Sequence, residues 1–196
     1  MNYLFHLYLS GNDPDILTGN FMGDFVKGRL GEQWPPQLRR GIELHRAIDS
    51  FAHTQPDFNR SRLRIDRSFG LYRGVLVDLF YDHFLASSFS TWSGEELHDY
   101  LRRARRMVED RESLLPQRLR QILPVIFEEM IPSYLDTEGV GCALGRMSRR
   151  IKRSNPLAGG EKELERNYDG LREDFHEFLA AARLFAEEFI DQQPPR

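Results

Sequence analysis

The chain has 196 residues, and its 27 lysines and arginines against 30 aspartates and glutamates give a formal net charge of −3 at pH 7. This charge does not mark the chain as a nucleic-acid-binding protein, and its single cysteine, Cys142, excludes an intramolecular disulfide and a zinc finger. No apolar run approaches the roughly 18 residues of a membrane span, and the first residues lack the basic start of a signal peptide. We therefore expect one globular domain in the cytosol.

Long segments of helical periodicity, separated by short breaks rich in Gly, Pro and Asp, predict an all-α fold. In chain order we expect helices at about 2–9, 14–27, 35–53, 69–88 and 93–110, with Asp13 capping the second and the Ser93–Glu96 capping box starting the fifth. A helix from Pro116 should break or kink at Pro124 and Pro132, and a helix at about 138–153 follows. After a loop that contains Gly159 and Gly160, a long final helix runs to about 191. The predicted domain spans 1–191, and 192–196 form a frayed tail.

The predicted helix at 35–53 carries polar residues on its apolar face. At about 100° per residue, the stripe is formed by Leu38, Gly41, Ile42, His45, Ile48, Asp49 and Ala52. His45 and Asp49 lie at its centre, one turn apart, and His53 follows a further turn along the same side. A buried unpaired carboxylate costs several kcal/mol, so a partner must compensate it. An ion pair with an arginine and a bound metal ion are the two alternatives.

The predicted helix at 69–88 has the same anomaly, because Leu71, Val75, Asp78, Asp82 and Leu85 share one face. Two carboxylates one turn apart repel each other unless a cation lies between or near them. Two further polar residues interrupt apolar stretches, namely Asp24 and His6. Imidazole and carboxylate donors suit Mn²⁺, Fe²⁺ or Mg²⁺ better than a thiolate zinc site does. These patterns alone leave a metal site and a network of ion pairs as alternatives.

Four blocks within residues 1–86 contain these polar residues. They read Met1-Asn2-Tyr3-Leu4-x-His6-Leu7, Gly19-Asn20-Phe21-Met22-Gly23-Asp24-Phe25-Val26-Lys27-Gly28, Gly41-Ile42-x-Leu44-His45-Arg46-x-Ile48-Asp49 and Asp78-Leu79-x-Tyr81-Asp82-His83-Phe84-Leu85. In order and spacing, the four blocks together resemble the acyl carrier protein phosphodiesterase family. Length and helical character agree with this family over most of the chain.

The resemblance implies a compact helical fold related to the HD-domain metal phosphohydrolases, with an atypical arrangement of His and Asp. It implies a Mn²⁺-dependent hydrolase that converts holo acyl carrier protein into apo carrier protein and free 4′-phosphopantetheine. The chain departs from the family pattern at Ala52-His53-Thr54-Gln55-Pro56, where the family commonly has Thr-Asp-x-His-Pro. His53 and Gln55 would have to take over any role of those two positions. The matching polar residues are His6, Asn20, Asp24, His45, Arg46, Asp49, Asp78, Asp82 and His83.

For such a hydrolase we expect each of these residues to have a defined role. The alkoxide of the carrier serine is a poor leaving group, so it needs a proton donor, and His83 and His53 are the candidates. Arg46 would hold a phosphoryl oxygen, or alternatively form an ion pair between helices, and Asn20 would contact substrate. Mg²⁺ and Fe²⁺ are alternatives to Mn²⁺. The expected metal ligands are drawn from Asp24, His45, Asp49, Asp78, Asp82 and His6.

Clusters of arginine predict a docking surface for an acidic carrier protein, because such patches attract acidic partners and speed their encounter. A solvated helix face is the alternative, since acidic residues lie beside the first cluster. We expect neither nucleic acid nor a membrane as a partner. The first cluster is Arg102, Arg103, Arg105 and Arg106, and the second is Arg146, Arg149, Arg150, Lys152 and Arg153.

Three competing functions stay open at this point. An HD-type phosphohydrolase would act on a nucleotide or another small phosphodiester, and a non-enzymatic helical module would bind through its basic face without a metal. A di-iron bundle needs Glu-x-x-His pairs that face inward, but Glu95/His98 and Glu173/His176 lie opposite the apolar stripes of their helices. We expect Cys142, between two glycines, to be a buried thiol rather than a nucleophile.

Overall fold

The computed structural model describes residues 1–192, and within this range it contains helices and no strand. This confirms the predicted all-α fold. The α-helices are α1 (Tyr3–Tyr8), α2 (Pro14–Phe21), α3 (Pro36–Thr54), α4 (Pro56–Arg64), α5 (Arg73–Ser87), α6 (Phe89–Ser93), α7 (Leu97–Glu109), α8 (Gln117–Val125), α9 (Thr137–Arg150), α10 (Glu161–Arg166) and α11 (Tyr168–Asp191). Short 3₁₀ turns are η1 (Gly23–Phe25), η2 (Arg67–Tyr72), η3 (Glu112–Leu114) and η5 (Pro132–Leu135), and η4 (Ile126–Met130) is a π-helical segment.

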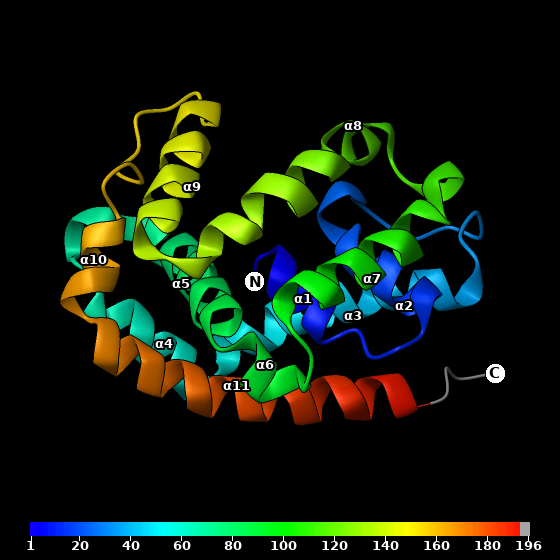
Figure 1. The fold of residues 1–196 in the computed structure, drawn as a ribbon, viewed down its shortest axis with the longest axis horizontal. Helices are drawn as coiled ribbons and strands as arrows, with labels where there is room; N and C mark the ends of the chain where they lie inside the picture. The colour runs from blue at the N-terminus through cyan, green and yellow to red at the C-terminus, as the bar shows by residue number, and fades with distance from the viewer. Residues whose placement is uncertain (193–196) are drawn as a thin grey trace.

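The short helix α1 lies in the middle of the molecule, where it contacts α2 and α5 (Figure 1). The long helix α11 runs along one side and packs against α3, α4 and α5. On the other side, α8 and α9 splay apart as two arms that are joined through η4 and η5, and η5 packs against α5. No helix in the described range is long and apolar enough to span a membrane.

Helices α2 and α3 pack backbone against backbone because two glycines face each other. A Cβ atom on Gly19 would lie 2.1 Å from the carbonyl oxygen of Leu38, and one on Gly41 would lie 2.2 Å from that of Ile16. Neither backbone atom can move aside cheaply, so larger residues would force the helices apart. This close packing brings the end of α2 against the middle of α3, where His45 lies.

The core is built from aromatic rings of α1, α4, α5 and α11. Phe178 contacts the rings of Phe5, Phe58 and Tyr81 at centroid distances of 5.6, 5.8 and 5.3 Å. In α11, Phe175, Phe178 and Leu179 are fully buried, whereas Phe185 and Phe189 are only half-buried. Leu123, Ile126, Phe127 and Met130, at the end of α8 and in η4, are buried as well.

The segment after α3 differs from the prediction. Pro56, which we expected only as a break, is the first residue of an additional helix, α4. The N–H group at the first position of a helix has no partner within the helix, so proline, which lacks this group, is well tolerated there. A proline can therefore start a helix as well as end one. The predicted 69–88 helix begins later, at Arg73, and Leu71 and Val75 are exposed rather than buried. The inward face of α5 therefore starts at Leu76 and not at Leu71.

Three local predictions also need correction. Helix α2 ends at Phe21 instead of about Lys27, because the chain turns through η1 and places Gly23 against His45. Ser93 does not cap α7, since its hydroxyl lies 2.9 Å from the carbonyl oxygens of both Phe89 and Glu95, within the turn that ends α6, and donates there. Cys142 is exposed, because it lies off the buried stripe of α9 formed by Val140, Ala143 and Leu144.

Other boundaries agree closely with the prediction. Helix α3 spans nearly its predicted length, and Asp13 caps α2 as expected, its carboxylate accepting the N–H groups of Asp15 and Ile16. The predicted distortion around Pro124 is present as the π-helical segment η4 that follows α8. The final segment divides into α10 and α11. Of the predicted tail, the part beyond Gln192 lies outside the described residues.

Candidate active site

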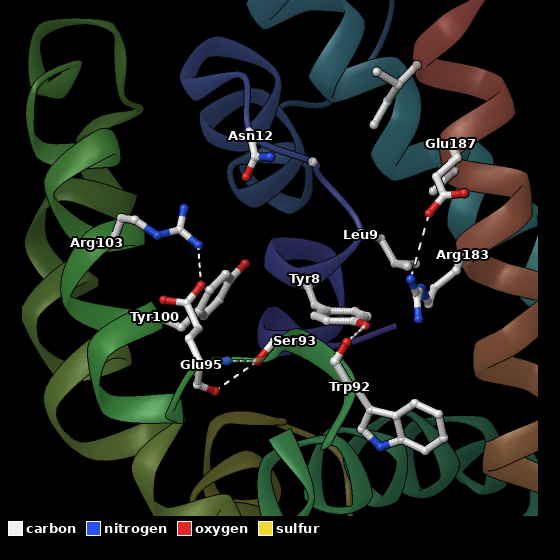
Figure 2. Close-up of a pocket in the computed structure, with 13 residues that line it drawn as sticks. Tyr8, Leu9, Asn12, Trp92, Ser93, Glu95, Tyr100, Arg103, Arg183 and Glu187 are labelled. Atoms are coloured by element: carbon white, nitrogen blue, oxygen red, sulfur yellow. Dashed lines mark hydrogen bonds and ion pairs between the residues drawn. The ribbon is translucent and has the colours of Figure 1, made fainter. Parts of the chain in front are cut away.

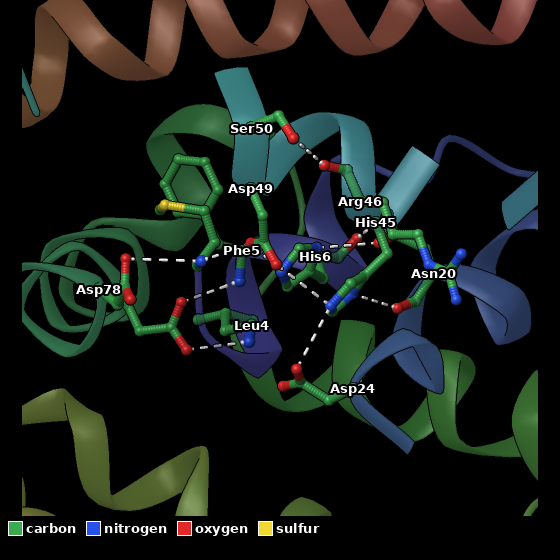
Figure 3. A network of polar contacts seen from close by, with 12 residues as sticks. Leu4, Phe5, His6, Asn20, Asp24, His45, Arg46, Asp49, Ser50 and Asp78 are labelled. Atoms are coloured by element: carbon green, nitrogen blue, oxygen red, sulfur yellow. Dashed lines mark hydrogen bonds and ion pairs between the residues drawn. The ribbon is translucent and has the colours of Figure 1, made fainter. Parts of the chain in front are cut away.

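Two buried histidines from different helices stack at the centre of the site. His6 of α1 and His45 of α3 are 2% and 4% exposed, and their rings are parallel within 19° at a centroid distance of 3.9 Å (Figure 3). Gly23 makes room for this arrangement, since a Cβ atom there would lie 2.2 Å from Cγ of His45. The glycine at position 23 of this sequence block is therefore required on steric grounds, because any side chain there would collide with the His45 ring.

Asn20 fixes the proton position on both rings. The amide nitrogen of Asn20 donates to the carbonyl oxygen of His6, so its amide oxygen faces Nδ1 of His6, at 2.9 Å. Nδ1 of His45 lies 2.8 Å from the backbone carbonyl oxygen of Asn20. Oxygens of this kind only accept hydrogen bonds, so both Nδ1 atoms must donate. In the neutral rings, each Nε2 atom is then left with a free lone pair.

Both Nε2 atoms point toward carboxylates. Nε2 of His6 lies 3.3 Å from Asp49, and Nε2 of His45 lies 3.4 Å from Asp49 and 3.6 Å from Asp24. Donor atoms of His6, His45 and Asp49 all lie within 4.8 Å of one another. Nε2 of His6 is buried and has no hydrogen-bond partner in the described residues. The predicted convergence of imidazole and carboxylate groups from separate helices is thus present for these residues.

The charges of the cluster favour a bound cation. Burial and the neighbouring His45 lower the pKa of His6 to about 4, so its ring is neutral near pH 7. Although burial pushes it upward, the Met1 ammonium group helps to hold the pKa of Asp49 well below its usual range. A neutral ring whose lone pair faces an ionised carboxylate is repelled unless a cation binds both, and the donor set therefore fits a divalent metal ion.

Asp78 and Asp82 lie beside this cluster but do not face the histidines. The N-terminal ammonium group of Met1 lies 2.7 Å from Asp49 and 3.5 Å from Asp78. Burial raises the pKa of Asp78, and the ammonium group offsets part of that rise. Asp82 is fully buried and accepts the backbone N–H groups of Leu4 and Phe5 at 3.0 and 2.9 Å. The amine and amide hydrogens of the N-terminal segment thus compensate the two carboxylates of α5 only in part, since burial still raises the pKa of Asp82 to about 7.

The two predicted proton donors occupy different surroundings. His83 is buried, with Nδ1 2.8 Å from the carbonyl oxygen of Tyr134 and Nε2 3.1 Å from the hydroxyl of Tyr168, away from the His6–His45 cluster. His53 is exposed at the end of α3, one turn beyond Asp49, and its ring meets Phe58 edge to face. Of these two histidines, only His53 is accessible from solvent.

Arg46 borders a hollow of 300 Å³ beside the cluster, which Asp24, Lys27, His45 and Asp49 also line. Its guanidinium group donates to the carbonyl oxygens of Val26 and Gly28, at 3.1 and 2.8 Å, so it has no carboxylate partner in the described range. The hollow therefore combines the candidate ligands with two cationic side chains. Sequence reasoning missed Lys27, because it placed this residue at the end of the predicted helix at 14–27, whereas α2 ends at Phe21 and Lys27 lies in the loop that follows η1.

Asn20 was predicted to contact substrate, but the structure places it behind the histidines. It has no exposed surface, and its amide nitrogen also donates to the hydroxyl of Ser10, at 2.9 Å. The signal that could have identified this role is the spacing Gly19-Asn20-x-x-Gly23, in which Gly19 permits close packing of α2 on α3 and Gly23 leaves room for the His45 ring.

Most arginines of the predicted docking cluster on α7 already have carboxylate partners. Arg102 pairs with Asp99 at 2.9 Å and Arg103 pairs with Glu95 at 2.5 Å. Arg105 contacts Glu109 and Glu128 at 2.6 Å each, whereas Arg106 is exposed with no ion pair within the described residues. In the second cluster, Arg146 lies 4.0 Å from Glu129. His98, Glu173 and His176 are exposed, which agrees with the expectation that no di-iron pair faces inward.

A separate cavity of 240 Å³ lies between the end of α1, the α6–α7 connection and α11 (Figure 2). Its two arginines face carboxylates, Arg103 with Glu95 and Arg183 with Glu187, the latter at 4.0 Å. The hydroxyl of Tyr8 donates to the carbonyl oxygen of Trp92. Since its charges are matched and no predicted ligand lines it, this cavity is not the candidate active site.

The neutral state of His6 leads to a prediction about pH and stability. In metal-free protein, unfolding lets His6 take up a proton at its ordinary pKa of 6.5, whereas the folded protein resists it down to about 4. The unfolded state binds more protons in this interval, so lowering the pH from 6.5 to 4 should remove about 3 kcal/mol of stability through this residue. Urea unfolding in the presence of EDTA should show this loss to be much smaller in His6→Asn. The exposed His98, replaced in His98→Asn, serves as the control and should keep the wild-type pH dependence; equal pH dependence in His6→Asn would contradict the prediction.

The fold and the buried cluster of histidines and carboxylates define a helical protein with a candidate site for a divalent metal ion. A family model described as acyl carrier protein phosphodiesterase matches residues 1–182. The chain is 28% identical over 180 residues to the acyl carrier protein phosphodiesterase of Serratia proteamaculans, and 29% identical over 180 residues to that of Escherichia coli O6:H1. Both alignments cover 91% of this chain and 93% of the relative.

The chain belongs to the acyl carrier protein phosphodiesterase family. This confirms the predicted family and the predicted enzyme class, a phosphoric diester hydrolase. A third relative, the acyl carrier protein phosphodiesterase of Photorhabdus laumondii, is 27% identical over 187 residues, which cover 91% of this chain and 93% of the relative. No solved structure matches the chain, and the relation to the HD-domain fold stays a prediction.

Proposed function

We propose that this protein hydrolyses holo acyl carrier protein to apo carrier protein and 4′-phosphopantetheine, using a divalent cation held by His6, His45 and Asp49. The observation that carries the proposal is the buried Nε2 atom of His6, which has no partner and faces Asp49 at 3.3 Å. Asp24 lies 3.6 Å from Nε2 of His45 and would complete the ligand set. The substrate follows from the family to which the chain belongs.

The donor set favours Mn²⁺ over Mg²⁺. Two imidazole nitrogens are unusual for Mg²⁺, which prefers oxygen ligands and retains its waters, and no thiolate is present to favour a soft-metal site. When bound, the cation would polarise the phosphoryl group and lower the pKa of water at the site. Asn20 would orient both histidines, because its two oxygens hold their Nδ1 protons and leave Nε2 free.

The cationic side chains of the hollow would bind the phosphodiester. Arg46 uses part of its guanidinium group to hold the loop at Val26 and Gly28, and its remaining N–H groups can donate to a phosphoryl oxygen. Lys27 lines the same hollow and adds a second positive charge. The two side chains would orient phosphorus with the bond to the carrier serine in line for displacement.

Hydrolysis breaks the bond between phosphorus and the serine oxygen, and that oxygen must receive a proton as it leaves. We assign the proton to His53 rather than His83, because His53 is exposed one turn beyond Asp49 and His83 is buried against Tyr134 and Tyr168. Docking of the acidic carrier protein on α7 stays a prediction, and Arg106 is the member of that cluster with an unmatched charge.

Metal removal tests the proposed function. EDTA should lower release of 4′-phosphopantetheine from holo carrier protein by at least about 100-fold, and Mn²⁺ should restore it, because the proposed cation contributes several kcal/mol to the reaction. Release is measured as the mass shift from holo to apo carrier protein. His45→Asn should lose both Mn²⁺ binding and activity, while the control His98→Asn, which changes an exposed histidine, should retain both.

Two results would contradict the proposal. Full turnover in the presence of the chelator would show that the reaction does not require a metal ion. Hydrolysis of nucleotides or small phosphodiesters, without release from the carrier protein, would favour the HD-type phosphohydrolase that acts on a small substrate.

A further inference from the structure

The helix that carries His6 is too short to hold its own position. Helix α1 has 6 residues, and Asn2, which precedes its first turn, makes no side-chain cap. A helix of this length is unstable in isolation, since the first turn fixes several dihedral angles for few hydrogen bonds. Its first N–H groups also lack partners within the helix. The position of His6 therefore depends on groups outside α1.

Asp82 supplies these missing contacts from α5. Its two carboxylate oxygens accept different N–H groups, Oδ2 from Leu4 at 3.0 Å and Oδ1 from Phe5 at 2.9 Å (Figure 3). The carboxylate is fully buried, and no other hydrogen bond to it occurs in the described part of the chain. It acts as an N-cap contributed by a residue 77 positions further along the chain than Phe5, at the end of the helix dipole that favours negative charge.

The other end of α1 is held independently. The Asn20 amide donates to the carbonyl oxygen of His6 and to the hydroxyl of Ser10, and Ser10 in turn donates to the same carbonyl oxygen at 2.6 Å. With Asp82 at the first turn and Asn20 at the last, the His6 ring has one place to lie, stacked on His45 with Nε2 toward Asp49. Loss of the contact at the first turn would free α1 to shift along the histidine stack.

We infer that Asp82 is a positioning residue and not a metal ligand: it fixes the start of α1 and thereby holds Nε2 of His6 at the cation site. The inference rests on the proposed function, because it assigns His6 to that site. Each oxygen of Asp82 accepts a backbone N–H group, and among the described residues Asp82 belongs neither to the ion pairs of His6 and His45 nor to the group of donor atoms that His6, His45 and Asp49 form. Asp82 thus differs from Asp49, whose oxygens face both rings.

The variant Asp82→Asn tests this role with nearly unchanged volume. An asparagine can accept one of the two N–H groups, but its own NH₂ group then faces the other N–H group, and two donors repel. We expect the His6 side-chain resonance, observed in ¹⁵N-histidine-labelled protein without metal, to shift or broaden. Binding of Mn²⁺, measured by titration calorimetry, should weaken by about 10- to 100-fold, as is typical when a group that orients a ligand is lost.

Asp174→Asn is the matched control, because Asp174 is also a carboxylate buried to 1% exposure but contacts Arg60, Arg64 and Ser61 at the other side of the core. It should lower the melting temperature yet leave the His6 resonance and Mn²⁺ affinity unchanged. An unchanged His6 resonance in Asp82→Asn, or an equal change in Asp174→Asn, would overturn the inference. Absence of Mn²⁺ binding to wild-type protein would instead overturn the proposed function, and the metal-free resonance would still test the role of Asp82.

Discussion

Asp49→Ala is expected to lower the turnover of holo carrier protein by at least about 1000-fold while the protein keeps its helical fold. Asp49 is the only carboxylate in the described residues whose oxygens lie near both histidine rings, at 3.3 and 3.4 Å. Its loss would leave the proposed cation with two neutral ligands and Asp24, which lies near His45 but not near His6. Removing several kcal/mol of stabilisation from the transition state corresponds to three or more factors of ten in rate.

The test measures kcat from the mass shift of the carrier protein and helix content from far-ultraviolet circular dichroism. Asp49 is 38% exposed, so its replacement creates no large cavity and the helices should stay intact. Asp169→Ala removes an exposed carboxylate of α11 and should retain full activity. Turnover within tenfold of wild type in folded Asp49→Ala would show that this residue does not bind the cation.

Asp174→Ala is expected to have the largest effect on stability, at about 3 kcal/mol. Asp174 of α11 is 1% exposed and receives hydrogen bonds from Arg60, Ser61 and Arg64 of α4, at 2.5, 2.9 and 2.8 Å. Removing it would leave the Arg64 guanidinium group and the buried Ser61 hydroxyl without this acceptor, whereas Arg60 would keep Asp57 and Glu177. Breaking a buried ion pair typically costs 3–5 kcal/mol, and the lower value applies because the arginine side chains are 42% and 34% exposed.

A loss of this size should lower the melting temperature by about 6–12 °C in a protein of this length. Urea unfolding followed by circular dichroism provides the free energy of unfolding. Asp169→Ala serves as the control on the same helix, because Asp169 and its partner Arg172 are 84% and 51% exposed and such surface pairs contribute less than about 1 kcal/mol. A change below about 1 kcal/mol in Asp174→Ala would mean that α4 and α11 are held by their apolar contacts alone.

Sequence patterns identified the residues of the site more reliably than their roles. The stripe on α3 placed His45 and Asp49 on one inward side, and the structure has His45 buried and Asp49 half-buried there. The stripe on α5 also indicated correctly that Asp78 and Asp82 point inward, but the cation near Asp78 is the ammonium group of Met1, and Asp82 binds backbone N–H groups. A helical wheel predicts the direction in which a side chain points, but it does not predict which group that side chain contacts.

Differences in the helix boundaries have a related cause. Pro56 was expected only to end the preceding helix. Proline is also favoured at the first position of a helix, so the same residue is equally compatible with the start of a new one. The packing of α4 against α11 selects the second outcome. Ser93 and Glu96 match the spacing of a capping box, but Gly94, with φ of 75°, ends α6 there and the Ser93 hydroxyl is used within that turn. A local sequence signal of this kind is compatible with two backbone structures, and contacts with residues distant in the sequence select one of them.

The sequence by itself determined the helical fold class, the family and the set of imidazole and carboxylate residues, because periodicity and motif spacing are properties of consecutive residues. Only the tertiary structure decided which of them meet: His6 and His45 stack because Gly23 leaves room for the ring and Asn20 orients both Nδ1 atoms. It also separated His83 from the cluster, although His83 directly follows Asp82 in the chain. Adjacent helical residues point about 100° apart, so the partner of each is set by the helix packed against it.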